Sequence, residues 1–128
     1  MGPADVISVF STLYKSISAG LQSLKPGNLG SCVDRAAREV IVGAGYPDYN
    51  HATGHPIAEV AHSPGTLLAP GDNSRSQRPV QENGTYTIEP RCQVPNGGSI
   101  EEMAVATSDG GITLCNRQSE LWVIGRNI

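Results

Sequence analysis

The chain has 128 residues, a formal net charge of -3 at pH 7 and no basic run, so it lacks the electrostatic signature of a nucleic-acid-binding protein. Its 15 glycines, 9 prolines and 5% aromatic residues predict one loop-rich domain over residues 1–128 rather than a helical bundle. The sequence resembles neither a signal peptide at its start nor a membrane span anywhere, which predicts a cytoplasmic protein with no membrane partner.

Two helices are predicted at the start of the chain. Apolar residues recur every three or four positions over residues 4–24, which is typical of an amphipathic helix, and the Pro-Gly pair at 26–27 ends it. Ser31 is the predicted N-cap of a second helix, whose apolar stripe extends over residues 33–41 before the glycines at 43–45 end it.

Short strands are predicted beyond residue 46, where Gly, Pro, Asn and Asp recur every few positions. Residues 85–88 and 103–107 alternate as strands do, and the turn residues at 108–111 predict a hairpin that continues into 112–114. The polar stretch 72–81 predicts a mobile surface loop. The predicted fold class is therefore α+β, with two N-terminal helices followed by short antiparallel strands and hairpins.

The cysteines and the C-terminal apolar residues are predicted to be structural. Cys32, Cys92 and Cys115 are odd in number and widely spaced, so they predict buried or half-buried thiols and not a disulfide framework or a zinc ribbon. Leu121 and Trp122 are predicted to pack against the helices.

All three histidines, His51, His55 and His62, lie within residues 51–62. Gly54 and Pro56 argue against a helix in this stretch, and in a strand the even spacing of His51 and His55 would place both on one face. The cluster is therefore a candidate source of imidazole ligands for a metal ion.

Two carboxylates downstream could complete such a site. Glu89 ends the first predicted strand, and Glu101, with Glu102, begins the next one. Together with an imidazole, these groups suit a divalent ion such as Mn, Co or Zn. The pattern alone leaves open whether they are ligands or solvated surface charges.

Four ordered blocks of sequence resemble a known family. The blocks are His51-Ala52-Thr53-Gly54-His55, Ala61-His62-Ser63-Pro64, Tyr86-Thr87-Ile88-Glu89-Pro90 and Ile100-Glu101-Glu102. In order and spacing they are similar to the signature blocks of the pita-bread metallopeptidases of the creatinase, aminopeptidase P and prolidase type. The resemblance extends over nearly the whole chain and corresponds to the C-terminal half of the family's catalytic domain, so the expected fold is half of a pita-bread fold.

The resemblance implies a site with two divalent ions, held by two aspartates, one histidine and two glutamates. By position, His55, Glu89 and Glu101 would be metal ligands in this chain. Glu89 would also handle the proton of the attacking water, and His51 and His62 would be the catalytic histidines that contact substrate. The implied reaction is hydrolysis of a peptide with proline at the second position by metal-activated water.

The family's two aspartate ligands have no counterpart in these 128 residues. We therefore expect the chain to be inactive alone and to form a homo-oligomer or pair with a missing N-terminal half, which would cover exposed strand edges. Pro56, Ser63, Arg91 and Ser99 depart from the family pattern. These departures favour the alternative of a non-catalytic peptide- or protein-binding module, and a metal-free enzyme resembling creatinase is a third hypothesis.

Overall fold

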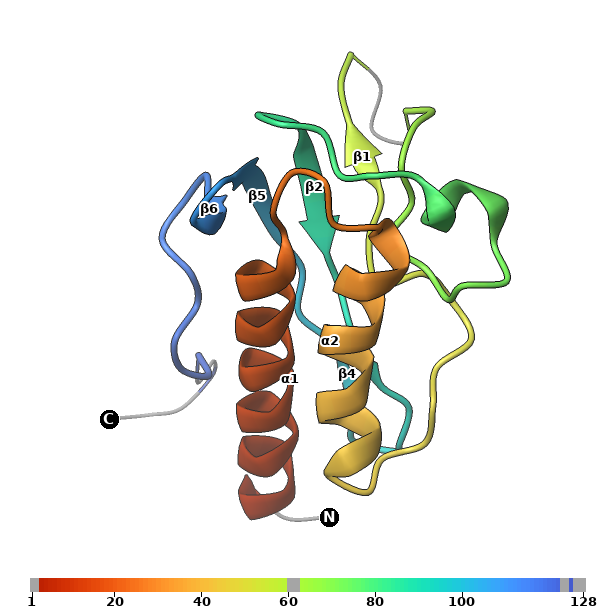
Figure 1. Ribbon diagram of the computed structural model, residues 1–128. Helices are drawn as coiled ribbons and strands as arrows, with labels where there is room; N and C mark the ends of the chain where they lie inside the picture. The colour runs from red at the N-terminus through yellow and green to blue at the C-terminus, as the bar shows by residue number, and fades with distance from the viewer. Residues whose placement is uncertain (1–2, 60–62, 123–124, 126–128) are drawn as a thin grey trace.

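The computed structural model describes residues 3–59, 63–122 and 125. Two helices lie side by side on one face of a small antiparallel sheet (Figure 1). The helices are α1 (Pro3–Ser23) and α2 (Gly30–Gly43), and a short 3-10 helix, η1, spans Ser74–Gln77. The predicted α+β class, with two N-terminal helices before short antiparallel strands, is confirmed.

The main sheet has four antiparallel strands in the order β1-β2-β5-β6. These strands are β1 (Pro56–Ile57), β2 (Thr85–Ile88), β5 (Glu102–Thr107) and β6 (Gly110–Thr113). A separate hairpin pairs β3 (Arg91–Cys92) with β4 (Gly98–Ser99). The predicted hairpin over residues 103–114 is confirmed, because β5 and β6 pair through a tight turn at Thr107–Gly110.

The core lies between the helices and the sheet. Helix α1 turns its apolar stripe inward, and the side chains it buries are Val9, Leu13, Ile17 and Leu21. The sheet contributes Tyr86, Ile88, Ala104 and Ala106, all at most 2% exposed. Each large apolar side chain buried in this way stabilises the fold by about 1.5–3 kcal/mol. The two helices approach closely where Ser16 Oγ donates to Ala37 O at 2.7 Å.

The start of α2 differs from the prediction of a Ser31 cap. The helix begins at Gly30, and Leu29 occupies the N-cap position without a side-chain hydrogen bond. The Gly30 N–H instead donates to Arg78 O at 3.1 Å, and Leu29 pairs with Pro79 as an isolated β-bridge. A distant backbone segment therefore satisfies one of the N–H groups at the helix start that have no partner within the helix.

The segment 72–81 lies mostly at the surface, as predicted, but it contains η1 and is held by hydrogen bonds, so it is not an irregular loop. Asn73 caps η1 by accepting from Arg75 N at 2.9 Å. Ser76 is fully buried and donates to Pro70 O, while the Arg75 guanidinium donates to Gly65 O and Ser63 O. The polar groups of this segment therefore find hydrogen-bond partners within the protein, which composition alone does not reveal.

The C-terminal segment is held by a charged residue and not by its apolar ones. Trp122 is 76% exposed and Leu121 is also exposed, so the prediction that they pack on the helices is wrong. Arg117 lies over the ring of Tyr14 in α1 and donates to Tyr14 O and Ser18 Oγ, each at 2.9 Å. A guanidinium therefore anchors this segment to α1.

The cysteines differ in exposure. Cys92 is buried and Cys32 half-buried, as predicted, whereas Cys115 is exposed; all three are free thiols.

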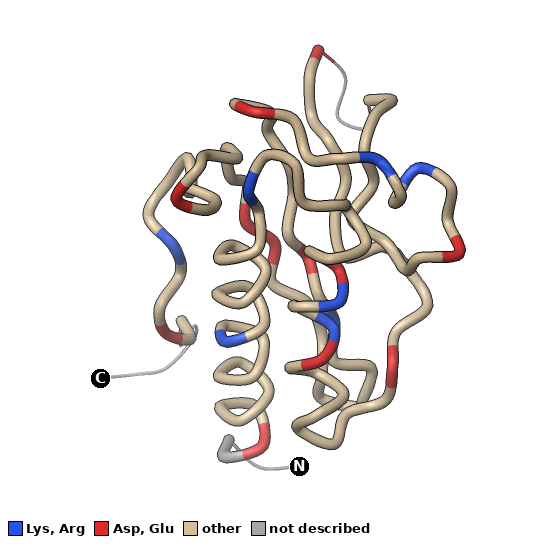
Figure 2. Tube along the Cα trace, viewed as in Figure 1, with Lys and Arg blue, Asp and Glu red and all other residues tan. Residues whose placement is uncertain are grey.

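The charged residues are dispersed. Acidic and basic residues are interspersed along the trace (Figure 2). No helix in the described ranges is both long and apolar enough to cross a bilayer.

Candidate metal centre

Three predicted ligands meet at one edge of the main sheet. His55 precedes β1, Glu89 follows β2 and Glu101 precedes β5. Because β2 is antiparallel to both neighbours, its end lies beside the beginnings of β1 and β5. One ligand atom from each of the three residues lies within 4.8 Å of the other two. The structure thus brings together residues that are 46 positions apart in the sequence (101 − 55).

Backbone hydrogen bonds fix the position of His55 relative to Glu89. The Thr87 N–H donates to His55 O at 2.9 Å, and the Glu89 N–H donates to Thr53 O at 2.6 Å. The Thr87 hydroxyl adds a third bond by accepting from His55 N at 3.0 Å. As a result, His55 Nε2 lies 3.5 Å from Glu89 Oε2. Backbone hydrogen bonds, and not side-chain packing alone, therefore set the distance between His55 and Glu89.

The environment of these two side chains fits a bound cation. His55 Nδ1 lies 3.2 Å from Pro56 O, and a carbonyl only accepts, so Nδ1 carries the proton. In the neutral ring, Nε2 then presents its lone pair toward Glu89 Oε2. That carboxylate oxygen is buried and accepts no hydrogen bond from the residues that the structure describes. A lone pair facing an unsatisfied buried carboxylate oxygen is the donor arrangement that a divalent metal stabilises.

The other two predicted histidines have different outcomes. His51 lies in a loop, in agreement with the argument against a helix, and not in a strand, so the condition for a shared strand face is not met. The loop nevertheless brings His51 to the same pocket as His55. His51 Nδ1 lies 2.7 Å from Ala52 O, which places the proton on Nδ1, and its ring stacks on Tyr49 at 4.7 Å. His62 lies outside the described residues.

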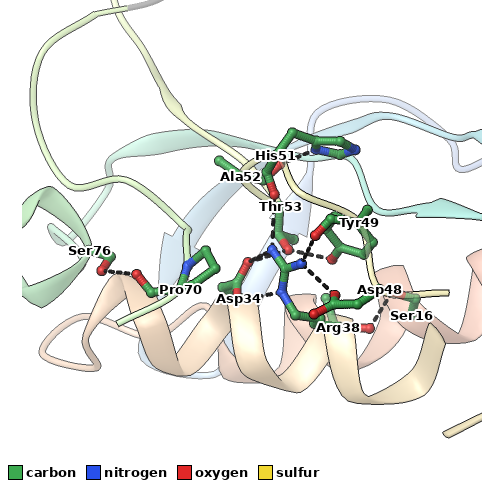
Figure 3. A network of polar contacts seen from close by, with 11 residues as sticks. Ser16, Asp34, Arg38, Asp48, Tyr49, His51, Ala52, Thr53, Pro70 and Ser76 are labelled. Atoms are coloured by element: carbon green, nitrogen blue, oxygen red, sulfur yellow. Dashed lines mark hydrogen bonds and ion pairs between the residues drawn. The ribbon is translucent and has the colours of Figure 1, made fainter. Parts of the chain in front are cut away.

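A network of polar contacts centred on Arg38 of α2 holds the loop that carries His51 (Figure 3). The guanidinium of Arg38 donates to both carboxylate oxygens of Asp34, at 3.0 and 2.8 Å, and to Asp48 at 2.7 Å. It also donates to the backbone carbonyls of Tyr49 and His51, the latter at 2.9 Å. One side chain in the helix therefore binds three points of the loop at 48–51.

The same network continues to Thr53. The Thr53 hydroxyl donates to Asp34 at 2.7 Å, so its oxygen is left to accept from the Tyr49 hydroxyl at 2.6 Å. Burial raises the pKa of Tyr49 to about 12. Burial acts to lower the pKa of Arg38, but its hydrogen bonds to Asp34 and Asp48 outweigh this effect and raise the pKa above its ordinary value. Arg38 is therefore a permanent cation and Tyr49 a neutral phenol at physiological pH.

Sequence reasoning did not identify this network. The i,i+4 spacing of Asp34 and Arg38 was visible, but such pairs usually lie on a solvated helix face. Here the Asp34 side chain is 3% exposed and that of Arg38 12% exposed. Only the fold shows that the pair points toward the loop at 48–51, which carries His51.

A pocket of about 430 Å³ opens beside His55 and Glu89, two of the three predicted ligands. Its lining includes His51, His55, Glu89, Arg91 and Ser99. A volume of this size is within the range of small-ligand sites. Charged side chains of both signs, Glu89 and Arg91, therefore line the pocket.

Comparisons with known proteins agree with this geometry. The model of metallopeptidase family M24 matches residues 1–114. Among curated proteins, "Probable dipeptidase PepE" of Mycobacterium tuberculosis H37Rv is 31% identical over 124 residues, which cover 94% of this chain and 32% of that protein. The chain therefore spans about a third of the length of this relative.

Solved structures of similar proteins superpose closely on the fold. Dipeptidase PepE from Mycobacterium ulcerans has a TM-score of 0.82 and 32% identity, and the match covers 96% of this chain and 32% of that one. An X-Pro aminopeptidase from Thermotoga maritima has a TM-score of 0.83 and 28% identity, and the match covers 97% of this chain and 35% of that one. The expected resemblance to part of a pita-bread fold is confirmed.

Proposed function

Since this chain belongs to metallopeptidase family M24, we propose that it supplies the His–Glu–Glu part of a divalent-metal site that hydrolyses short Xaa-Pro peptides. The convergence of His55, Glu89 and Glu101 at one sheet edge, within 4.8 Å, is the observation that carries the proposal. The names of the relatives support the substrate class, because one similar protein is an X-Pro aminopeptidase and others are dipeptidases.

The chemistry follows from the donor set. His55, Glu89 and Glu101 would hold a divalent ion such as Mn, Co or Zn, which would supply Lewis-acid chemistry beside the pocket. Glu89 Oε2 is the buried oxygen that receives the proton of the attacking water. His51, with Nδ1–H donated to Ala52 O, presents Nε2 to the pocket and donates to a substrate oxygen only when the ring is protonated.

We propose that hydrolysis needs further ligands from a partner segment, because the resemblance implies two aspartates that the 128 residues do not supply. The outer face of β5 and β6 supports pairing with such a segment or with a second copy. Its exposed apolar side chains are Met103, Ile112 and Leu114, at 43%, 60% and 53% exposure. An edge strand that carries exposed apolar side chains offers a surface on which another strand or chain can dock.

The alternative is a non-catalytic peptide-binding module. Its specific support is that Arg91 and Ser99, two departures from the family pattern, both line the pocket. In that case the pocket would bind a peptide without cleaving it, and the metal ligands would be unused.

Calorimetric titration of the metal-stripped chain with Mn, Co and Zn tests the proposal. His55→Ala and Glu89→Ala should each weaken binding by more than the roughly 10- to 100-fold that loss of a second-shell partner causes. Glu82→Ala, an exposed carboxylate before β2, is the matched control and should leave the affinity unchanged. Absence of metal binding by the unmutated chain would rule out the metal site and favour the binding module.

A further inference from the structure

Glu101 differs from the other two predicted metal ligands in its exposure. His55 and Glu89 are half-buried, and backbone hydrogen bonds join residues 53–55 to residues 87–89. Glu101 is exposed, and it lies one position beyond the last residue pair of the β2–β5 ladder, which joins Ile88 to Glu102. A contact made by Glu102 therefore acts at the point of the sheet where the direction of the Glu101 side chain is set.

The side chains of Glu101 and Glu102 project to opposite sides of the sheet. Ile88, the direct partner of Glu102, and Ala104, two positions further along β5, are both fully buried in the core that α1 covers. Because neighbouring residues of a strand alternate between faces, Glu102 points to the helix side. Glu101 then points to the opposite side, where the three predicted ligands meet.

The C-terminal segment, residues 115–122, reaches Glu102 on the helix side. The Gln118 N–H donates to Glu102 Oε2 at 3.3 Å. The preceding residue, Arg117, lies over an aromatic ring of α1 and donates two hydrogen bonds to that helix. Figure 1 shows the segment running beside α1. The segment therefore links α1 to the first residue of β5, directly next to a predicted ligand.

We propose that the C-terminal segment positions Glu101 for metal binding through the hydrogen bond from Gln118 to Glu102, with Arg117 as its anchor. The assignment rests on the proposed function, because it concerns the same ligand set. None of Glu102, Arg117 and Gln118 is among the described residues that line the pocket, so they are positioning residues and not ligands. A carboxylate that accepts a backbone N–H is held by a charge-assisted hydrogen bond, which is stronger than one between neutral groups.

Cobalt titration of the metal-stripped full chain tests the proposal. Calorimetry gives the affinity, and visible absorption responds to the geometry of the ligands around the ion. Glu102→Ala should weaken binding roughly tenfold and alter the spectrum. Glu102→Gln retains an oxygen that accepts from Gln118, so its affinity should stay within about twofold of the unmutated chain. Asp109→Ala, which removes an exposed carboxylate at the far end of the β5–β6 hairpin, is the matched control and should change neither readout.

A double-mutant cycle shows whether the anchor acts through Glu102. Arg117→Ala should weaken cobalt binding, and Arg117→Ala/Glu102→Ala should bind no more weakly than Glu102→Ala, because the two residues belong to one chain of contacts. Additive losses overturn the proposal, as does unchanged affinity and spectrum in Arg117→Ala. An equal loss in Glu102→Gln and Glu102→Ala also overturns it, since the charge of Glu102 and not its hydrogen bond would then hold the ion. All titrations are made at a temperature at which circular dichroism shows every variant to be folded.

NMR of the metal-free chain keeps the two proposals apart. Arg117→Ala should shift or broaden the amide resonances of Glu101 and Glu102, and it should leave that of His55, on the far side of β2, in place. If the unmutated chain binds no cobalt but these resonances move, the metal site fails and the link from the C-terminal segment to Glu101 stands. If cobalt binds and neither the resonances nor the affinity respond to Arg117→Ala, the metal site stands and the positioning role fails.

Discussion

Gly54 lies so close to Thr87 that a side chain at residue 54 has no space. A Cβ built on Gly54 would lie 2.8 Å from the carbonyl carbon of Thr87, and still closer to its oxygen. The same residue exchanges both backbone hydrogen bonds with Leu68, at 3.1 and 3.0 Å. Gly54 thus allows the histidine segment to lie between β2 and the segment at 68, which is what brings His55 to Glu89.

Gly54→Ala should therefore destabilise the fold strongly. Because the obstructing atoms belong to the backbone, the strand must shift, and we expect a loss on the order of 3 kcal/mol in the free energy of unfolding. Urea denaturation followed by circular dichroism measures it. Gly43→Ala, where a Cβ meets nothing within 4 Å, is the control and should change stability by less than about 1 kcal/mol. Equal stabilities of the two variants would contradict the packing argument.

Arg38→Lys should weaken metal binding through the histidine loop. A lysine ammonium cannot reproduce the two-oxygen pair with Asp34 while also reaching Asp48 and the carbonyl of His51. We expect a loss of about 2–4 kcal/mol in stability and an affinity for zinc reduced roughly tenfold. The measurements are urea denaturation and calorimetry at a temperature where both proteins are folded.

Arg35→Lys controls for the change of residue type on the same helix, since Arg35 is exposed. It should leave both quantities unchanged. A destabilised Arg38→Lys that binds zinc with unaltered affinity would show that the network stabilises the fold without positioning the ligands.

Much of the fold was predictable from periodicity, because the helices and the β5–β6 hairpin depend on local patterns. Helix α1 is amphipathic over its whole length, and the turn at Thr107–Gly110 contains the residues that tight turns require. The ligands His55, Glu89 and Glu101 were found by resemblance, since their proximity arises from strand pairing across 46 positions (101 − 55). Composition alone left them indistinguishable from solvated charges.

The features that sequence reasoning missed depend on tertiary partners. Gly30 finds its acceptor in Arg78 O, 48 positions away (78 − 30), so no local capping rule could reveal it. The burial of Ser76 and the orientation of Arg38 likewise result from segments that the fold brings together. Trp122 was predicted to pack against the helices from its residue type, and its exposure shows that residue type alone does not determine burial.

Arg117→Ala should release the C-terminal segment from α1. The guanidinium makes two hydrogen bonds to α1 and covers the Tyr14 ring at 3.8 Å, which together contribute about 2 kcal/mol. We expect faster limited proteolysis beyond residue 114, with a smaller effect on the global unfolding midpoint. Arg78→Ala, an exposed arginine remote in sequence from this segment, should leave the cleavage pattern unchanged. Identical cleavage rates for Arg117→Ala and the unmutated chain would contradict the anchoring role.

The protein should lose stability at alkaline pH because Tyr49 stays protonated in the fold. The phenol has an ordinary pKa of 10.0, and burial raises the pKa of Tyr49 to about 12 in the folded chain. Between these values the unfolded state binds fewer protons than the folded state, so stability falls as pH rises through this window. The slope is about 1.4 kcal/mol per pH unit, or about 3 kcal/mol over the window.

Urea denaturation between pH 9 and 12 measures this loss, best in a Cys92→Ala background. Burial also raises the pKa of Cys92 from 9.0 to about 11, so its thiol would add a second loss at overlapping pH. Tyr49→Phe removes the ionisable group together with its hydrogen bond to Thr53. We expect this variant to be less stable at neutral pH but to lack the decline attributed to Tyr49. An unchanged slope in Tyr49→Phe would assign the alkaline transition to other groups and remove the link between burial of the phenol and the stability of the histidine loop.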